Sequence, residues 1–354
     1  MISRFSIVIV NVEVNNMEIT KNNQIIENAR PSISEVTQIS NEELRILHEI
    51  PTFRPIVQTV VVMSTYLILA AIGFWLNNWA VWLLVWFVQG FLFVCFFAAI
   101  HYCSHYSLYK SKNANRFMGT FLSLVLLMNF SFHKYIHIGH HREAKLKGKI
   151  VGDTSAWQTF PNIKTYLLAL TYFYPLAAWK NWWIVTKDLY LESFKTHTQE
   201  ESALPANFYL SYFKTPEQRQ FVLQNNWLLL GWFVLMGGLT VIFPVILFFG
   251  YWIPLITFAS PFGFIFSITD HYGCKFDLNH NLWNDTRTMI SNPIIRFYYW
   301  NNNYHVEHHL YPSMPPCNYS KIHELIKHQL EYLEKSYFMF HLKVMRGLIS
   351  AKSQ

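Results

Sequence analysis

Two pairs of long apolar segments dominate the pattern of hydrophobic and polar positions along the chain. Residues 56–76 and 80–100 contain no charged side chain, and only three residues separate them. Residues 227–249 and 251–269 repeat this pattern on either side of Gly250. Each segment is about long enough to cross a bilayer core of roughly 30 Å as a helix. The pattern therefore predicts an all-α integral membrane fold with four transmembrane helices in two hairpins.

Two shorter apolar stretches, residues 117–130 and 166–179, lie between the hairpins. About fourteen residues is more typical of an interfacial or re-entrant helix than of a span, so we place both stretches at the membrane surface or in a shallow re-entrant position. Residues 1–54 are predicted to form a polar cytosolic segment, residues 55–330 a membrane domain and residues 331–354 a cytosolic tail. The apolar run at residues 5–10 is too short to indicate a signal peptide.

Composition and charge agree with a membrane protein. Of the 354 residues, 52% are hydrophobic and 14% are charged. The net charge of +7 need not indicate nucleic acid, because Lys and Arg are absent from both hairpin tips and abundant between the hairpins. This positive-inside pattern predicts that the N-terminal, central and C-terminal segments are cytoplasmic. The four cysteines show no C-x-x-C spacing, so neither a disulfide framework nor a thiolate metal site is expected.

Eight of the sixteen histidines fall into three tight clusters: HYCSH at residues 101–105, HIGHH at 137–141 and HVEHH at 305–309. A helix aligns positions i, i+3 and i+4, so each cluster can direct two or three imidazoles at one point. Eight imidazoles exceed the ligands of one ion, which predicts two metals with open positions for chemistry. The three clusters must then share one membrane face, so residues 117–130 cannot cross. The predicted ligands are His101, His105, His137, His140, His141, His305, His308 and His309.

The remaining histidines and the acids beside the clusters are given other roles. His271, at the cytoplasmic end of the fourth segment, is a ninth candidate ligand. His133 is either a further ligand or a residue beside the ligands, and the second role is preferred. An acid next to a ligand is either an acceptor for an imidazole N–H or an ordinary surface charge; these acids are Asp270, Glu143 and Glu307. Structural or surface roles are expected for His48, His197, His280, His323, His328 and His341.

The ligand chemistry bears on the choice of metal. Imidazole alone does not distinguish zinc, copper and iron. Two metals with neutral nitrogen ligands and vacant positions suit dioxygen activation, whereas a hydrolytic pair of metals normally uses bridging carboxylates. Iron is therefore favoured.

The three clusters, followed by LYPSMPP, resemble the histidine boxes of the membrane fatty acid desaturase superfamily. The superfamily includes acyl-lipid and acyl-CoA desaturases, hydroxylases and carotenoid ketolases, and the resemblance covers about residues 56–330. It implies a four-span enzyme with a cytosolic, histidine-rich cap that holds two non-haem irons and uses O2 and two electrons to oxidise a C–H bond. By this resemblance His271 matches an additional ligand of stearoyl-CoA desaturases, and Ser267 replaces an Asn that holds a metal-bound water there.

The motifs also depart from some branches of the superfamily. The first box has three intervening residues where many acyl-CoA desaturases have four, and the third begins with His rather than the Gln of front-end desaturases. The stretch WNNNYHVEHHLYPSMP looks closer to bacterial members, including those that act on small secondary metabolites, which implies a bacterial inner membrane. Because the HPGG motif of a fused cytochrome b5 is absent, electrons are expected from a separate ferredoxin or cytochrome b5.

We predict a desaturase that introduces a C=C bond into a fatty acyl or similar hydrocarbon chain. The alternatives with the same centre are a hydroxylase or ketolase and a desaturase of a small secondary metabolite. A membrane metal carrier is disfavoured, because residues 56–100 and 227–269 contain no acid or histidine to line a path. Trp300 and Tyr304 either line the substrate channel or pack as interfacial aromatics, and the second role is preferred.

Overall fold

The fold is described from a computed structural model of the chain. It describes residues 39–147, 160, 162–170, 183, 186–187, 212–213, 215–274, 283 and 285–350. The chain divides into two units, Met1–Leu44 and Arg45–Gln354, and helix α3 (Asn41–Leu47) begins in the first and ends in the second. The second unit carries all the elements discussed below. Most of the predicted N-terminal segment lies outside the described residues.

Four helices in the described part of the chain are long and apolar enough to cross a membrane. They are α4 (Arg54–Leu76), α5 (Trp79–Ser104), α10 (Pro216–Ile242) and the helical run from Pro244 to His271. This run contains α11 (Pro244–Leu247), the π-helical turns η4 (Phe248–Trp252) and η5 (Leu255–Ala259), and α12 (Ser260–His271). The prediction of four long apolar helices is therefore confirmed.

Asn77 and Asn78 form the turn between the first two long helices. Asn77 adopts a left-handed conformation (φ 46°), and its N–H bonds to the carbonyl of Gly73, which closes α4. The side-chain oxygen of Asn78 accepts the N–H of Ala80 at 2.9 Å and caps the start of α5. Asparagine is one of the few residues with a Cβ that readily adopt the left-handed conformation, and its side chain is a favoured helix N-cap, so two residues suffice to reverse the chain.

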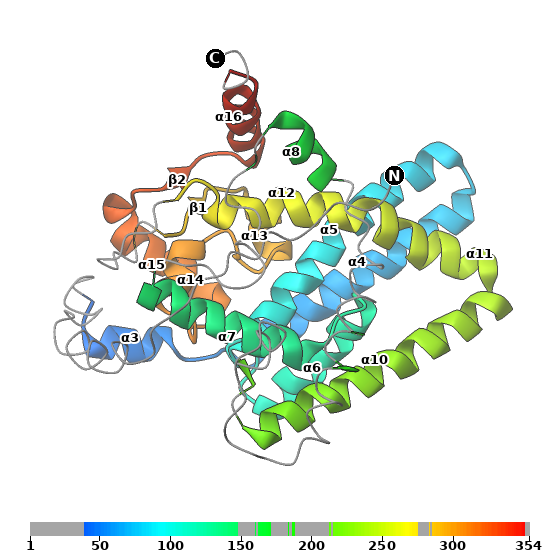
Figure 1. Ribbon diagram of the computed structural model, residues 1–354, viewed down its shortest axis with the longest axis horizontal. Helices are drawn as coiled ribbons and strands as arrows, with labels where there is room; N and C mark the ends of the chain where they lie inside the picture. The colour runs from blue at the N-terminus through cyan, green and yellow to red at the C-terminus, as the bar shows by residue number, and fades with distance from the viewer. Residues whose placement is uncertain are drawn as a thin grey trace. The chain divides into compact units, whose positions relative to one another are not determined.

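The second pair of long helices is divided at a different place from the one the sequence suggested. Helix α10 ends at Ile242, and the next helix begins with Pro244 after the non-helical Phe243 (Figure 1). Proline cannot donate an N–H to the preceding turn and disfavours helical geometry in the residue before it, so the helix breaks there. The predicted turn at Gly250 is wrong, because Gly250 lies within η4.

A sharp bend between α6 (Lys112–Val125) and α7 (Phe130–Lys147) returns the chain toward the end of α5. The two helices meet at 107°, and Leu127 in the connection has a φ of 54°. The side chain of Asn129 accepts the N–H of Phe132 at 2.9 Å, which caps α7. Because of this bend, the apolar stretch 117–130 is not one straight helix, in line with a re-entrant or surface position. Of the stretch 166–179, the structure describes residues 166–170, which are the end of helix α8 (Ile163–Ala169) and Leu170.

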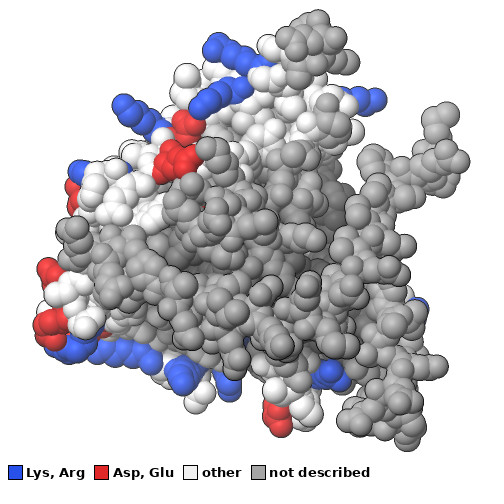
Figure 2. Space-filling model, turned by 60° about the vertical axis from the view of Figure 1, so that its left-hand side comes forward, with Lys and Arg blue, Asp and Glu red and all other residues white. Residues whose placement is uncertain are grey.

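The chain after α12 folds around the ends of α5 and α7 (Figure 1). Its helices are α13 (Pro293–Tyr298), α14 (His305–Leu310), α15 (Tyr319–Ile326) and α16 (Tyr337–Ser350), with short 3-10 turns η6 (Pro316–Asn318) and η7 (Lys327–Gln329). Strands β1 (Thr288–Met289) and β2 (Leu333–Glu334) pair in parallel, a small departure from an all-α fold. On the face shown in Figure 2, Lys and Arg side chains lie around the margin of the described surface.

Helix α5 is the centre of the packed core. Residues 92–104 of α5 are almost all buried, including Cys95 and Ile100 at 0% exposure. Helices α4, α6, α7 and α12 all pack against it. The end of α5 is therefore held from several sides, and it carries the first histidine cluster.

Candidate metal centre

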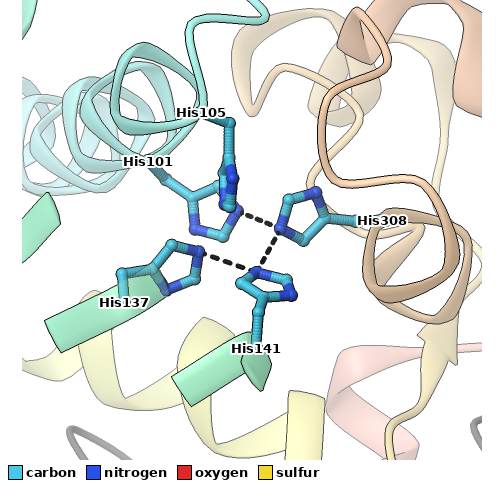
Figure 3. A group of neighbouring side chains, drawn as sticks. All are labelled: His101, His105, His137, His141 and His308. Atoms are coloured by element: carbon cyan, nitrogen blue, oxygen red, sulfur yellow. Dashed lines mark hydrogen bonds between the residues drawn. The ribbon is translucent and has the colours of Figure 1, made fainter. Parts of the chain in front are cut away.

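All nine histidines proposed from the sequence as ligands meet in the interior and form two groups. The first, which we call the five-histidine group, contains His101, His105, His137, His141 and His308 (Figure 3). The second, the four-histidine group, contains His140, His271, His305 and His309. Within each group the candidate ligand atoms lie within 4.8 Å of one another.

Helical periodicity explains how the clusters divide between the groups. Residues four apart lie on one helix face, so His137 and His141 of α7 stay together in the first group. His140 is rotated away from that pair and joins the second group. Helix α14 does the reverse, because His305 and His309 serve the second group and His308 the first. Two helices thus supply ligands to both groups and fix the distance between them.

The imidazole nitrogens converge at distances that suit metal ligands. In the five-histidine group, the Nε2 atom of His308 lies 2.7 Å from that of His101 and 2.9 Å from that of His141 (Figure 3). In the four-histidine group, Nε2 of His305 lies 3.2 Å from that of His271 and 3.1 Å from that of His309. Two nitrogens at right angles around an ion, each at roughly 2.1 Å from it, are separated by about 3 Å. The groups therefore fit two metal ions.

Burial keeps these imidazoles in the form that binds metal. The pKa values of six of them lie well below the usual 6.5, first because burial disfavours the charged ring and second because neighbouring imidazoles repel added charge. These six are His137, His140, His141, His305, His308 and His309. A neutral imidazole has a free nitrogen lone pair, which is what a metal requires.

Hydrogen bonds at Nδ1 orient two of the rings. The Nδ1–H of His308 donates to the hydroxyl of Tyr319 at 3.0 Å, and that hydroxyl donates to the carbonyl of Tyr311. The Nδ1–H of His271 donates to the carbonyl of Asp285 at 3.0 Å. Each bond fixes the tautomer that leaves Nε2 free to face the group, as is usual for metal-binding histidines.

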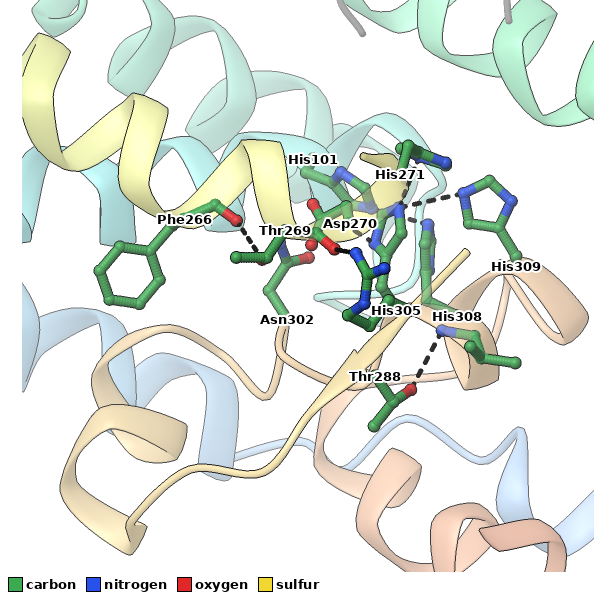
Figure 4. Close-up of polar contacts among 12 residues, drawn as sticks. His101, Phe266, Thr269, Asp270, His271, Thr288, Asn302, His305, His308 and His309 are labelled. Carbon is green, nitrogen blue, oxygen red and sulfur yellow. Dashed lines mark hydrogen bonds and ion pairs between the residues drawn. The ribbon is translucent and has the colours of Figure 1, made fainter. Parts of the chain in front are cut away.

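The acids beside the clusters have different partners. A carboxylate oxygen of Asp270 lies 3.8 Å from Nδ1 of His305, so Asp270 faces the four-histidine group (Figure 4). Glu307, by contrast, is fully buried and accepts hydrogen bonds from His323 Nδ1 at 2.6 Å and the Thr288 hydroxyl at 2.5 Å. Glu307 is thus neither a surface charge nor a partner of the nine histidines. The side chain of Glu143 lies outside the described residues.

A cavity borders both groups. Its polar walls include Ser267, Asp270, Tyr299 and Asn302, and its apolar walls include Phe97 and Ile136. The amide of Asn302 donates to the hydroxyl of Tyr299 at 3.0 Å. Tyr299 and Asn302 were not among the residues predicted from the sequence. The only available signal was their place just before the third cluster.

Three other residues considered from the sequence lie beside the site. His133 lines the cavity but belongs to neither group, and its ring stacks on that of His137 at a centroid distance of 5.5 Å. Trp300 and Tyr304 are buried and do not line this cavity. The Tyr304 hydroxyl accepts from Arg296, and its ring contacts His323. The packing role preferred for both aromatics agrees with these contacts.

Comparison with known families identifies the fold's relatives. The model of the fatty acid desaturase family matches residues 77–341, three quarters of the chain. The chain belongs to the fatty acid desaturase family. The matched region contains all nine histidines and the four-helix membrane scaffold apart from α4.

Individual relatives are similar at lower identity. An endoplasmic reticulum omega-3 fatty acid desaturase of Vigna radiata var. radiata is 27% identical, over 72% of this chain and 66% of its own length. An sn-1 acyl-lipid omega-3 desaturase (ferredoxin) of Nostoc sp. (strain 36) is 26% identical, over 76% of this chain and 74% of its own length. The chain spans only 54% of the chloroplastic omega-3 desaturase of Glycine max that it matches.

Proposed function

We propose that this chain is an O2-dependent membrane desaturase that introduces a C=C bond into a fatty acyl chain. The observation that carries the proposal is the convergence of nine imidazoles, seven buried and two (His105 and His137) partly buried, in two groups beside one cavity, within a desaturase-family fold. Two irons are the proposed metals. His101, His105, His137, His141 and His308 would hold one, and His140, His271, His305 and His309 the other.

When bound, the two irons would supply the oxidising chemistry by which O2 removes hydrogen from an unactivated C–H bond. The balanced reaction converts –CH2–CH2–, O2, two electrons and two protons into –CH=CH– and two waters. The protein would contribute position and exclusion of water. Phe97 and Ile136 offer an apolar wall for a hydrocarbon chain, and burial of the histidines keeps bulk water from the reacting carbons.

The electrons would come from a separate ferredoxin. Two relatives, from Nostoc sp. (strain 36) and Arabidopsis thaliana, are named as ferredoxin-linked acyl-lipid omega-3 desaturases. These names favour ferredoxin over cytochrome b5 as the donor and an acyl lipid over other carriers as the substrate.

The proposed membrane arrangement is two hairpins, α4–α5 and α10 with the Pro244–His271 helix, with the metal centre on the cytoplasmic face of a bacterial inner membrane. The positive-inside charge pattern supports this orientation. The catalytic membrane domain would extend over residues 55–330, between a cytosolic segment at residues 1–54 and a cytosolic tail at residues 331–354.

Product analysis tests the reaction. The full-length protein, purified in detergent and loaded with iron, is supplied with reduced ferredoxin, oxygen-18 gas and phospholipids of defined acyl chains. We expect an acyl product two mass units lighter than the substrate, without oxygen-18. A product sixteen mass units heavier with natural oxygen, or eighteen with the labelled gas, would overturn desaturation in favour of hydroxylation.

Iron content provides the matching control. His140→Ala and His308→Ala each remove a ligand from a different group, so each should bind about one iron fewer and lose desaturation. His328→Ala alters an exposed imidazole in η7 and should retain both irons. Full activity with zinc and without iron would contradict the assignment of the metal.

A further inference from the structure

A buried lysine lies between the first two histidine clusters without a carboxylate partner. Lys134 of α7 is 5% exposed, and its Nζ donates to the carbonyl of Ser104 at 2.7 Å. The same ammonium lies 3.4 Å from the centre of the Tyr106 ring. No carboxylate in the described part of the chain pairs with it. Burial of a charge is costly, so its two contacts must account for its position.

The carbonyl that Lys134 contacts belongs to the last residue of α5. A helix leaves its final carbonyls without an N–H partner from its own backbone, and its C-terminal end carries partial negative charge. After Ser104 the chain turns back: Tyr106 has a φ of 58°, and the N–H of Ser107 bonds to the carbonyl of Tyr102. Nε of Arg116 donates to the Tyr106 hydroxyl at 3.1 Å, which fixes the ring beneath the ammonium.

The place of Lys134 on α7 connects this contact to the metal centre. Lys134 precedes His137 by three residues and His141 by seven, so all three lie on one face of α7. Ser104 precedes His105 and follows His101 by three residues. One side chain therefore joins the helix ends that supply four of the five ligands in the five-histidine group. The four-histidine group takes one ligand from α7 and none from α5.

We propose that Lys134 is a positioning residue for the five-histidine group, in which its ammonium holds the C-terminal end of α5 against α7. The proposal rests on the metal site of the proposed function. It predicts an asymmetric effect, because loosening this contact shifts ligands of the first group relative to each other and leaves the ligand set of the second intact.

The test compares variants of the purified full-length protein by metal content, independently of catalysis. Lys134→Met keeps the length of the side chain and removes the ammonium, whereas Lys134→Gln removes the charge but retains an N–H donor. Lys112→Met, at the exposed start of α6, is the matched control. Each variant is loaded with ferrous iron and challenged with a chelator, and the irons lost are followed over time. Thermal unfolding of the metal-free proteins is measured alongside.

For Lys134→Met we expect one of the two irons to be lost about 10–100-fold faster, which matches the factor by which residues that orient ligands typically change metal affinity. The second iron should leave at the rate of the unaltered protein, as should both irons of Lys112→Met. For Lys134→Gln, the rate of loss of the faster iron should lie between the rates for Lys134→Met and for the unaltered protein. Two irons lost at unaltered rates from Lys134→Met would overturn the proposal. Equal acceleration for both irons in Lys134→Met and Lys134→Gln, with matching falls in unfolding temperature, would also overturn it, since that result indicates general destabilisation. Failure to desaturate a substrate would leave these rates unaffected and would count only against the proposed function.

Discussion

At the scale of single residues, the site is defined by imidazoles that share one buried volume and stay neutral. Spacing predicted eight of the nine candidate ligands, because i, i+3 and i+4 positions share a helix face, and the ninth, His271, was predicted from its position at the end of the fourth apolar segment. Their division into groups of five and four could not be predicted from spacing. It depends on how α7 and α14 are rotated about their axes, which long-range packing decides. The Glu307–His323 pair was hidden for the same reason, since sixteen residues separate its members.

The lowered imidazole pKa values predict how stability depends on pH. A free imidazole titrates near pH 6.5, whereas His140 and His308 take up protons in the folded protein only at much lower pH. Between these values the unfolded chain binds more protons, so the folded state is favoured fully above about pH 6.5 and loses stability as the pH falls below it. We expect the unfolding temperature of the metal-free protein to be level above about pH 7 and to fall toward pH 5.

Thermal scans in detergent at a series of pH values check this expectation. His140→Ala lacks one of the buried imidazoles, so its unfolding temperature should fall less steeply over the same interval. An unfolding temperature that rises on acidification from pH 7 would contradict the assignment of neutral rings.

At the scale of elements, the contact between α6 and α7 determines the position of the second histidine cluster. It returns this cluster to the end of α5. The short apolar stretch indicated that these residues do not span the membrane, but no pattern indicated a 107° bend. The bend depends on tertiary contacts of Asn129, whose amide donates to the carbonyl of Val222 and the side chain of Asn226. The turn predicted at Gly250 was also wrong because no clear signal in the sequence marked its true position. Both Gly and Pro occur within transmembrane helices, so Pro244 inside an apolar run gave no clear signal of a break.

The α6–α7 contact requires a glycine. A Cβ at Gly119 would lie 2.3 Å from Cε2 of Phe130, whose ring is fully buried and has little room to move. Gly119→Ala should therefore destabilise the protein by about 1–3 kcal/mol through overpacking, partly offset by roughly 1 kcal/mol of better helix propensity. Displacement of α7 should also weaken iron retention.

Gly231→Ala in α10 provides the control, because no atom lies within 4 Å of the added Cβ. It should leave iron binding unchanged, and its unfolding temperature should equal that of the unaltered protein or be slightly higher. Thermal unfolding and iron content of both variants would be measured side by side. Equal behaviour of the two substitutions would show that Gly119 is not needed for the α6–α7 contact.

At the scale of the whole molecule, the metal centre requires that the ends of α5, α7, α12 and α14 lie on one side of the membrane. The rings of His101 and His137 are 4.2 Å apart between centroids, so the α6–α7 segment cannot separate them by crossing. In the proposed four-span arrangement, both helix-to-helix turns, at Asn77–Asn78 and at Phe243, would face the opposite side of the membrane, and residues 331–354 would belong to the side of the histidines.

Labelling of single cysteines tests this arrangement and the corrected turn together. In a background with Cys317→Ser, the remaining cysteines Cys95, Cys103 and Cys274 are buried and should react little. Asn78→Cys and Phe243→Cys should react with a membrane-impermeant maleimide in intact cells, because short turns between spans extend into water. A cysteine added after Gln354 should react only after the cells are permeabilised. Gly250→Cys should stay unreactive in both conditions, since residue 250 lies within the helical run that is proposed to cross the bilayer. Reaction at 250 but not at 243 would restore the turn expected from the sequence, and reaction of positions 243 and 354 from the same side would exclude the four-span arrangement.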